Sequence, residues 1–283
     1  MSRYTEQELK YFDNPYKIAV IATTDDDGDL HMFNASTLMN KGDDEMMFGE
    51  FIRGVSKKYI HQRPKCGFLI MSADRHFWTG SMTFTHSVLE GEDYVYMNQY
   101  QLFRFNTYFG VCEVHYADLH DISKMRALNM PGVISNAVKV MAMKPFFAGD
   151  KSKQVMRPWT QEFMNGLITL EYLAFMGEDG FPKIVPIIQG QSASSSRIFF
   201  TKAPYSDMFE GLKDGVRCAI YGFSLDMEAT LLKGTYHEGP LGTGYLDIDK
   251  IYNTAPPISE PCYPEKKYEP IDFHDEPLAP DWI

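Results

Sequence analysis

The two halves of this sequence resemble each other at a constant spacing, and this repetition limits the folds open to the chain. Pairs separated by 152 residues (for the first, 173 minus 21) are Ile21 with Leu173, Ala22 with Ala174, Asp27-Gly28 with Asp179-Gly180, Phe48 with Phe200, and Cys66 with Cys218. A constant spacing over this much chain predicts two copies of one folding unit. The simpler alternative is that two unrelated antiparallel β domains share a strand–turn–strand pattern.

The correspondence continues with small shifts toward the end of each half. Gly80 matches Gly234, and Gly110–Tyr116 matches Gly242–Ile248 once residues 86–106 are treated as an insertion. This insertion is rich in aromatic residues and breaks the strand rhythm, so we expect it to form its own hairpin or loop.

Short apolar runs separated by turn residues predict antiparallel strands in the first half. Runs at Ile18–Thr23, Leu30–Met39 and Met46–Gly49 are separated by turns at residues 25–28 and 40–44, which contain Asp-Gly and Lys-Gly. Apolar runs of this length between such turns are typical of hairpins. Further strands are expected at Cys66–Met71, Phe77–Thr85 and Gly110–Tyr116.

Capping signals predict short helices between these strands. Thr5 followed by Glu8 forms a capping box for a helix over residues 5–12. Further helices are expected at Ser56–Gln62, which must end before Pro64, at Ile134–Phe147 and at Trp159–Met164, with a helical turn at Ile122–Leu128. The segment 148–158 has the composition of a linker, and the Pro-rich, acidic segment Thr254–Ile283 is expected to be extended.

Composition excludes several classes of function. The chain has 283 residues, 44% of them hydrophobic, and a formal net charge of −11. The length suggests two domains, and the negative charge argues against general nucleic-acid binding and against an anionic membrane surface. The first residues lack a secretory signal, and no apolar stretch is long enough to span a membrane. The four scattered cysteines lack Cys-x-x-Cys spacing, which predicts reduced thiols and a cytoplasmic location.

A basic helix start follows the first three apolar runs. Arg53, Ser56, Lys57 and Lys58 lie at the beginning of the predicted helix, where free N–H groups and the positive end of the helix dipole favour an anion. We therefore expect a phosphate-binding site here. The simpler alternative is a solvated helix start with surface lysines.

The order of apolar strand, Asp-Gly turn, strand, turn, strand and basic helix start resembles the FMN-binding split-barrel superfamily, which contains pyridoxamine 5′-phosphate oxidase. The resemblance implies that Arg53, Ser56, Lys57 and Lys58 hold the FMN phosphate. It also implies that the strand with Asn34, Ser36 and Thr37, and the segment Gly49–Ile52 with Phe51 and Ile52, line the isoalloxazine ring. Trp78 either stacks near this ring or packs in the core.

The second half departs from this pattern. At the spacing of 152 residues, Tyr205, Met208, Phe209 and Glu210 replace the four phosphate-site residues. We therefore expect one cofactor site per chain, in the first half. In single-barrel relatives FMN lies between two subunits, so two fused copies would imitate that dimer. Residues of the second half, which the sequence does not identify, would then complete the site.

No other motif assigns a chemistry. The eight histidines lack the His-x-x-x-His spacing of metal sites, so no metal is predicted, and His86, His115 or His237 would be candidates only if the fold bound haem. No Gly-x-Ser-x-Gly motif is present. The segment Gly239–Gly244 lacks the frame of a dinucleotide motif and is interpreted as a turn between strands.

Together these features predict a mainly β (α+β) fold of two tandem antiparallel split β-barrels with short flanking helices. The expected divisions are a cofactor-binding barrel over 1–130, a helical connector and linker over 131–158, a second barrel with a degenerate site over 159–255, and a Pro-rich tail over 256–283. The expected function is an FMN-dependent oxidoreductase with a small-molecule substrate or electron donor, either a monomeric pseudo-dimer or a homodimer. The catalytic residues are unknown. The alternatives are a deazaflavin or haem protein, or a binding module without a cofactor or enzymatic activity.

Overall fold

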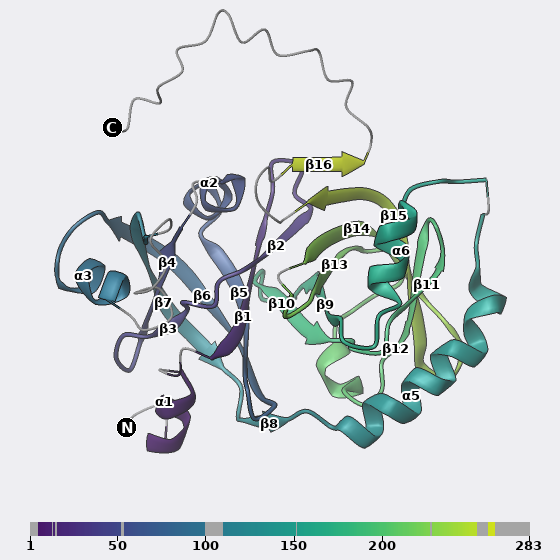
Figure 1. Cartoon of the computed structure of the whole chain (residues 1–283), viewed down its shortest axis with the longest axis horizontal. Helices are drawn as coiled ribbons and strands as arrows, with labels where there is room; N and C mark the ends of the chain where they lie inside the picture. The colour runs from purple at the N-terminus through teal and green to yellow at the C-terminus, as the bar shows by residue number, and fades with distance from the viewer. Residues whose placement is uncertain are drawn as a thin grey trace, which may run out of the picture.

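The chain forms two antiparallel β sheets that lie side by side, one from each half (Figure 1). The computed structural model describes residues 5–12, 14, 16–51, 54–99, 110–150, 152–226, 228–253 and 260–263. The strands β1, β2 and β5 of the first sheet face β9, β10 and β13 of the second in the middle of the molecule. The helices lie around the outside of this pair of sheets.

The first sheet has the strand order β2-β1-β5-β6-β7-β4-β3, with β8 pairing with β6 at one end. Its strands are β1 (Lys17–Thr24), β2 (Leu30–Asn34), β3 (Met39–Asn40), β4 (Glu45–Glu50), β5 (Lys65–Ser72), β6 (His76–Val88), β7 (Glu113–Ile122) and β8 (Arg126–Ala127). The β1–β2 pair is a hairpin around the Asp-Gly turn, in which Thr24 pairs with Leu30. Every strand pairing is antiparallel, as the turn pattern predicts.

The second sheet repeats this order strand for strand, as β10-β9-β13-β14-β15-β12-β11, with β16 pairing with β15. Its strands are β9 (Leu170–Met176), β10 (Pro182–Pro186), β11 (Gln191–Ser194), β12 (Arg197–Thr201), β13 (Arg217–Phe223), β14 (Ala229–Glu238), β15 (Thr243–Asn253) and β16 (Glu260–Tyr263). Four strands begin at the spacing seen in the sequence: β10, β11, β12 and β13 each start 152 residues after β2, β3, β4 and β5 (182 minus 30, for the first).

Equivalent positions of the two sheets also make equivalent contacts. The Thr37 hydroxyl donates to the Gly49 carbonyl at 3.1 Å, and the Gln189 amide donates to the Thr201 carbonyl at 2.8 Å. Both members of the second pair lie 152 residues after their counterparts (189 minus 37 and 201 minus 49). The predicted fold class, mainly β (α+β) with two tandem antiparallel split β-barrels, is thus confirmed in its class and in the tandem repeat of its strand order, although neither sheet closes into a barrel. Each sheet is open, since β2 and β3, or β10 and β11, are the ends of its path.

Most of the predicted helices are present. Helix α1 (Glu6–Phe12) begins with the expected capping box, in which the Glu8 carboxylate accepts from the Thr5 N–H at 2.8 Å and the Glu8 N–H donates to the Thr5 hydroxyl at 3.2 Å. Helix α2 (Val55–Gln62) ends before Pro64. Helix α5 (Met130–Met143), the 3₁₀ turn η1 (Lys144–Phe147) and helix α6 (Pro158–Met164) connect the two sheets. The boundaries of the four predicted divisions stay predictions.

Two local predictions need correction. Residues 92–99 of the expected hairpin or loop form helix α3 (Glu92–Gln99), while 100–109 lie outside the described residues. No helical turn forms at 122–128, because Arg126 and Ala127 pair as β8 with Phe77 and His76. In the tail, which was predicted to be extended, residues 260–263 form the strand β16 beside β15, and residues 254–259 and 264–283 lie outside the described residues. The glycine-rich segment after Gly239 is a 3₁₀ turn, η3 (Pro240–Gly242), between β14 and β15, as expected.

One hydrophobic cluster joins the two halves. Val20, Leu30 and Leu69 of the first sheet belong to the same buried cluster as Leu173 and Ile220 of the second. The first sheet has a separate cluster on its other side, which includes Phe12, Phe48 and Trp78. The first sheet therefore packs one of its faces against the second half. Within the described ranges, no helix has both the length and the apolar character that a membrane crossing requires.

Candidate functional site

The start of α2 presents backbone groups suited to an anion. The helix packs beside β1 and β2, its N-cap is Gly54 in an extended conformation, and no side chain caps it. Its first turn contains no acidic residue. Because the first N–H groups of a helix lack intrahelical partners, this end of α2 can accept a negatively charged group from outside the helix.

Ser56 connects this helix start to the second half through a buried histidine. Its hydroxyl lies 2.9 Å from Nε2 of His31. The His31 ring lies edge-on between Tyr59 of α2 and Tyr252 of β15, with ring centroids 5.1 and 5.0 Å away. Burial, with the charges of Lys233 and Lys57, lowers the pKa of His31 to about 3, so the imidazole is neutral at pH 7. The start of α2 therefore lies at the boundary between the halves.

The two predicted phosphate-binding lysines point in different directions. Lys58 is exposed, and its ammonium pairs with Asp26 at 2.8 Å. Arg63 pairs with the same carboxylate at 3.2 Å. Exposed pairs of this kind contribute little to stability because solvent screens them, so Lys58 can turn to a stronger anion. Lys57 instead points inward, with its ammonium 4.7 Å from the centroid of Phe33. Burial lowers the pKa of Lys57, and the nearby Glu50 carboxylate opposes that shift.

The residues predicted to line a flavin ring are spread over three environments. Asn34 and Ser36 are half-buried and share a 2.8 Å hydrogen bond at the end of β2. Thr37 is buried against Gly49, and Phe51 packs beside Met39 and Met47. Ile52 and Arg53 lie outside the described residues.

Trp78 occupies the core of the first half. Its ring lies 5.2 Å from that of Phe12 and 5.6 Å from that of Tyr11, and its indole N–H donates to Glu8 at 3.2 Å. All three partners belong to α1. The contacts therefore match the second alternative for Trp78, in which its ring packs in the core. The ring of Trp78 thus helps to attach α1 to the sheet.

Cations of the second half neutralise the acidic β1–β2 turn. Asp29 accepts from Arg217 at 2.8 Å and from Lys250 at 2.8 Å, and Lys233 pairs with Asp25 in a buried position. Lys250 also reaches Asp27. The hydrogen bonds from Arg217 hold the pKa of Asp29 well below its usual range. This acidic cluster is therefore an electrostatic contact between the halves, with its carboxylates already paired.

A second polar cluster lies where α2 covers the β4–β7 region of the first sheet. Its buried members are Glu50 at the end of β4 and His115 of β7, with relative exposures of 2% and 1%. The His115 Nε2 atom lies 3.2 Å from a Glu50 carboxylate oxygen. His61 of α2 and Glu113 of β7 complete the group, with all three ligand atoms of His61, Glu113 and His115 within 4.8 Å of one another.

His61 and His115 are far apart in the sequence and lack a metal-ligand spacing, so no metal site was expected from them. The available signal was alternation along a strand, because Glu113 and His115 are two residues apart and must share a face of β7. Lys57 and His61 are likewise one helical turn apart and share a face of α2. Only the fold brings that helix face onto that strand face.

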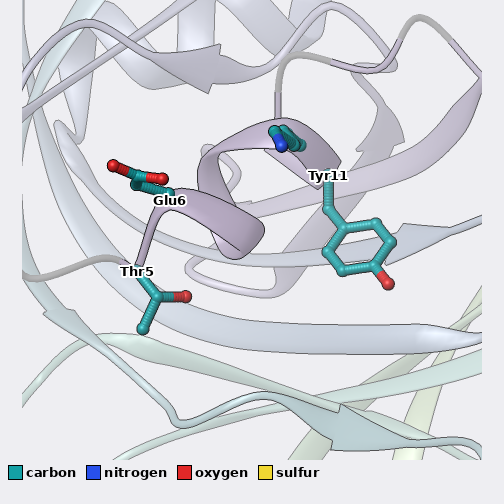
Figure 2. Close-up of a pocket in the computed structure, with 4 residues that line it drawn as sticks. Thr5, Glu6 and Tyr11 are labelled. Atoms are coloured by element: carbon teal, nitrogen blue, oxygen red, sulfur yellow. The ribbon is translucent and has the colours of Figure 1, made fainter.

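A surface hollow lies apart from both groups of residues. Thr5, Glu6, Lys10 and Tyr11 line it on the outside of α1. Figure 2 shows Glu6 and Tyr11 pointing to different sides of that helix. Because these side chains diverge, the hollow does not gather polar groups around one point.

The second half carries aromatic side chains where the first has its basic helix. In place of α2 it has only the 3₁₀ turn η2 (Ser206–Phe209). Tyr205 and Phe209 are buried, and the Tyr205 hydroxyl accepts from the Asn129 N–H at 2.8 Å. The first turn of η2 also carries the acidic Asp207, which disfavours an anion at this place.

No family model and no curated protein sequence matches the chain. Solved structures similar to part of it include an FMN-binding protein from Syntrophomonas wolfei, at 15% identity and a TM-score of 0.37, over 44% of this chain and 89% of that one. An F420 reductase matches at 13% identity and a TM-score of 0.34, over 43% and 99%. HupZ from Group A Streptococcus matches at 16% identity and 0.35, over 42% and 91%. Each of these matches covers less than half of this chain.

Proposed function

We propose that the chain binds FMN, with the phosphate at the start of α2 and the ring toward the boundary between the two halves. The observation that carries this proposal is the uncapped start of α2, which adjoins Ser56 and the exposed Lys58 and lacks acidic residues. An anion there would meet helix N–H groups, a hydroxyl and a mobile cation, which are the groups that phosphate requires.

The residues around this helix start are compatible with a flavin. Asn34 and Ser36 offer half-buried polar groups at the end of β2, and β2 borders β9, β13 and β14 of the second half. Tyr252, which touches His31, is the residue of the second half that we assign to this site. In the superfamily that the sequence resembles, the flavin lies between two such units, so one chain here would act as a pseudo-dimer.

The activity we propose is a flavin-dependent oxidoreduction of a small molecule. A bound flavin would supply the transfer of hydride or electrons. The chain's own contribution would be to hold the phosphate at Ser56 and Lys58 and to exclude water at the boundary. Neutral His31, with its ring held between Tyr59 and Tyr252, would keep Ser56 in place rather than exchange protons near pH 7.

Two other cofactors, a deazaflavin and haem, can be weighed against FMN on particular residues. A deazaflavin also carries a phosphate and would use the same helix start. Haem would require an accessible histidine: His86 stacks on Tyr116, and His237 stacks on Tyr245, so each ring already has one face covered. A binding module without any cofactor remains the contrasting class.

The test is to purify the full chain and titrate it with FMN. We expect yellow protein or saturable quenching of FMN fluorescence. The double variant Ser56→Ala with Lys58→Ala should weaken FMN binding by roughly 10- to 100-fold, because one hydroxyl contact and one cationic contact to the phosphate are lost. Lys213→Ala is the matched control, since Lys213 is an exposed lysine paired with Glu178 in the second half.

The outcomes separate the alternatives. Equal FMN affinity in the double variant and in Lys213→Ala would remove α2 from the site. A Soret band would favour haem, and protein that ignores FMN, deazaflavin and haem alike would favour the binding module. Lys57→Ala is less informative, because it leaves the Glu50 carboxylate without its neighbouring charge.

A further inference from the structure

The cluster between α2 and β7 contains polar atoms that the rest of the fold leaves unused. Among the described residues, Nδ1 of His115 and Oε1 of Glu50 are buried without a hydrogen-bond partner. Unpaired buried polar atoms are costly and uncommon in folded proteins. Nδ1 of His115 is therefore available to a group that binds at this place.

The contacts of His115 determine which of its two ring nitrogens can bind a ligand. Nε2 faces the Glu50 carboxylate at 3.2 Å, so a neutral ring with its proton on Nε2 donates to Glu50. The lone pair then lies on Nδ1. A carboxylate that fixes the far nitrogen of a histidine in this way is the usual support of a histidine bound to a metal.

Glu113 and His61 bring two further ligands to the same place. The Ser87 hydroxyl donates to one Glu113 oxygen and leaves the other oxygen for a ligand. His61 approaches from α2, with its ring 5.7 Å from that of His115 between centroids. Two imidazoles and one carboxylate form a ligand set that zinc accepts, with a fourth position left for water or another ligand.

We propose that His61, Glu113 and His115 bind one divalent transition-metal ion of the zinc type. Their ligand atoms lie within 4.8 Å of one another. Ligands about 2.0–2.1 Å from a tetrahedral ion are roughly 3.4 Å apart, so closure requires a movement of about 1 Å. His61 is exposed and provides this movement by turning its side chain.

Charge and chemistry favour this class of ion over others. Imidazole ligands suit zinc, cobalt, nickel and iron, whereas magnesium and calcium prefer ligand sets made of oxygen. With Lys57 charged, the two carboxylates Glu50 and Glu113 give the group a formal charge of −1, which a divalent ion reverses. The acidic β1–β2 turn has no such role, because cations of the second half already pair with its carboxylates.

The experiment is a titration of the full, tag-free chain with Co²⁺ after treatment with a chelator. We expect visible d–d absorption that saturates at one equivalent and is abolished when Zn²⁺ displaces cobalt. His61→Ala should weaken binding by about 100-fold or more, and it is the first variant to make because His61 is exposed. Glu50→Gln, which acts through His115, should weaken binding by roughly 10- to 100-fold.

The matched control is His237→Ala, which removes a partly exposed histidine of the second half that lies between Asp214 and Asp247. Its Co²⁺ affinity should equal that of the wild type, with circular dichroism showing that all variants are folded. Wild-type protein without saturable d–d bands would overturn the proposal. The proposal would also be overturned if the His61→Ala protein bound cobalt as tightly as the control. Neither readout depends on a flavin, so FMN binding and metal binding are tested separately.

Discussion

At the scale of single residues, opposite charges define the contact between the two halves. Asp29 lies in the β1–β2 turn of the first half and is paired with Arg217 and Lys250 of the second. Only 7% of its surface is exposed. A carboxylate held in this way by two cations favours its charged form, so its pKa falls on folding.

This pairing predicts a pH-dependent contribution to stability. The pKa of Asp29 is lowered from 3.8 on folding, so its contribution is complete above the unfolded value and is lost as the pH falls below about 4. Asp29→Asn should lower the free energy of unfolding by about 1.5–3 kcal/mol at pH 7. Urea unfolding at pH 7, 5 and 3 should show this difference shrinking at the lowest pH.

Asp43→Asn is the comparison variant, because Asp43 is an exposed carboxylate in the turn between β3 and β4. It should change stability by less than about 0.5 kcal/mol. If the stability lost in Asp29→Asn were as large at pH 3 as at pH 7, the ion pairs of Asp29 would not be its source. Equal losses of stability in both variants would contradict them as well.

At the scale of strands, β5 and β10 approach each other so closely that one position must be glycine. A Cβ atom on Gly67 of β5 would lie 1.9 Å from the carbonyl oxygen of Pro182 on β10. The equivalent position of the second sheet, 152 residues later, is Ala219. The requirement for glycine therefore comes from the contact between halves, because the same place within the other sheet accepts a methyl group.

Gly67→Ala should force β5 and β10 apart and destabilise the protein by about 1–3 kcal/mol. Thermal unfolding followed by circular dichroism measures this effect. Gly110→Ala serves as the control, because Gly110 is exposed and a Cβ atom there would lie 3.0 Å from a side-chain oxygen of Asn98, with no backbone atom among its close neighbours in the described residues. A Gly67→Ala protein with unchanged stability would show that the two strands are farther apart than described.

Sequence patterns predicted strands well because each strand is a short apolar run between turn residues. The offset of 152 residues anticipated where β10 to β13 begin. The helix α3 was missed because Glu92–Gln99 lacks an apolar stripe, with Met97 its one fully buried residue. β8 was missed because two residues form no periodic pattern, and its conformation depends on pairing with β6.

The candidate sites were less accessible to sequence reasoning. The position of Ser56 on a helix start followed from the local pattern, but its contact with His31 and Tyr252 depends on how the halves pack. Lys57 follows Glu50 by only seven residues (57 minus 50), but the local pattern does not show that its ammonium turns inward to lie near Phe33 and Glu50. Glu50, Glu113 and His115 come together only through the pairing of β4 with β7.

At the scale of the whole molecule, the buried cluster shared by the two halves predicts cooperative unfolding. Val20, Leu69 and Phe77 of the first half contribute to the cluster that contains Leu173 and Ile220 of the second. Separating the halves would expose this apolar surface to water, at a cost of about 25 cal/mol per Å². Neither sheet is therefore expected to unfold without the other.

Differential scanning calorimetry should show one transition, and Asp29→Asn and Gly67→Ala should shift that transition as a whole. The ratio of calorimetric to van't Hoff enthalpy should be close to one. Two resolved transitions, with only one of them moved by either variant, would mean that the halves are independent.

Because the two equivalent sheets belong to one polypeptide, each can acquire substitutions that the other does not share. In an assembly of two identical chains, every substitution appears twice, and dilution can separate the partners. Here a substitution alters one sheet only, and the linker keeps the local concentration of the partner high whatever the amount of protein. The turn η2 can therefore bury Tyr205 and Phe209 where the other sheet has its basic helix, without loss of that helix.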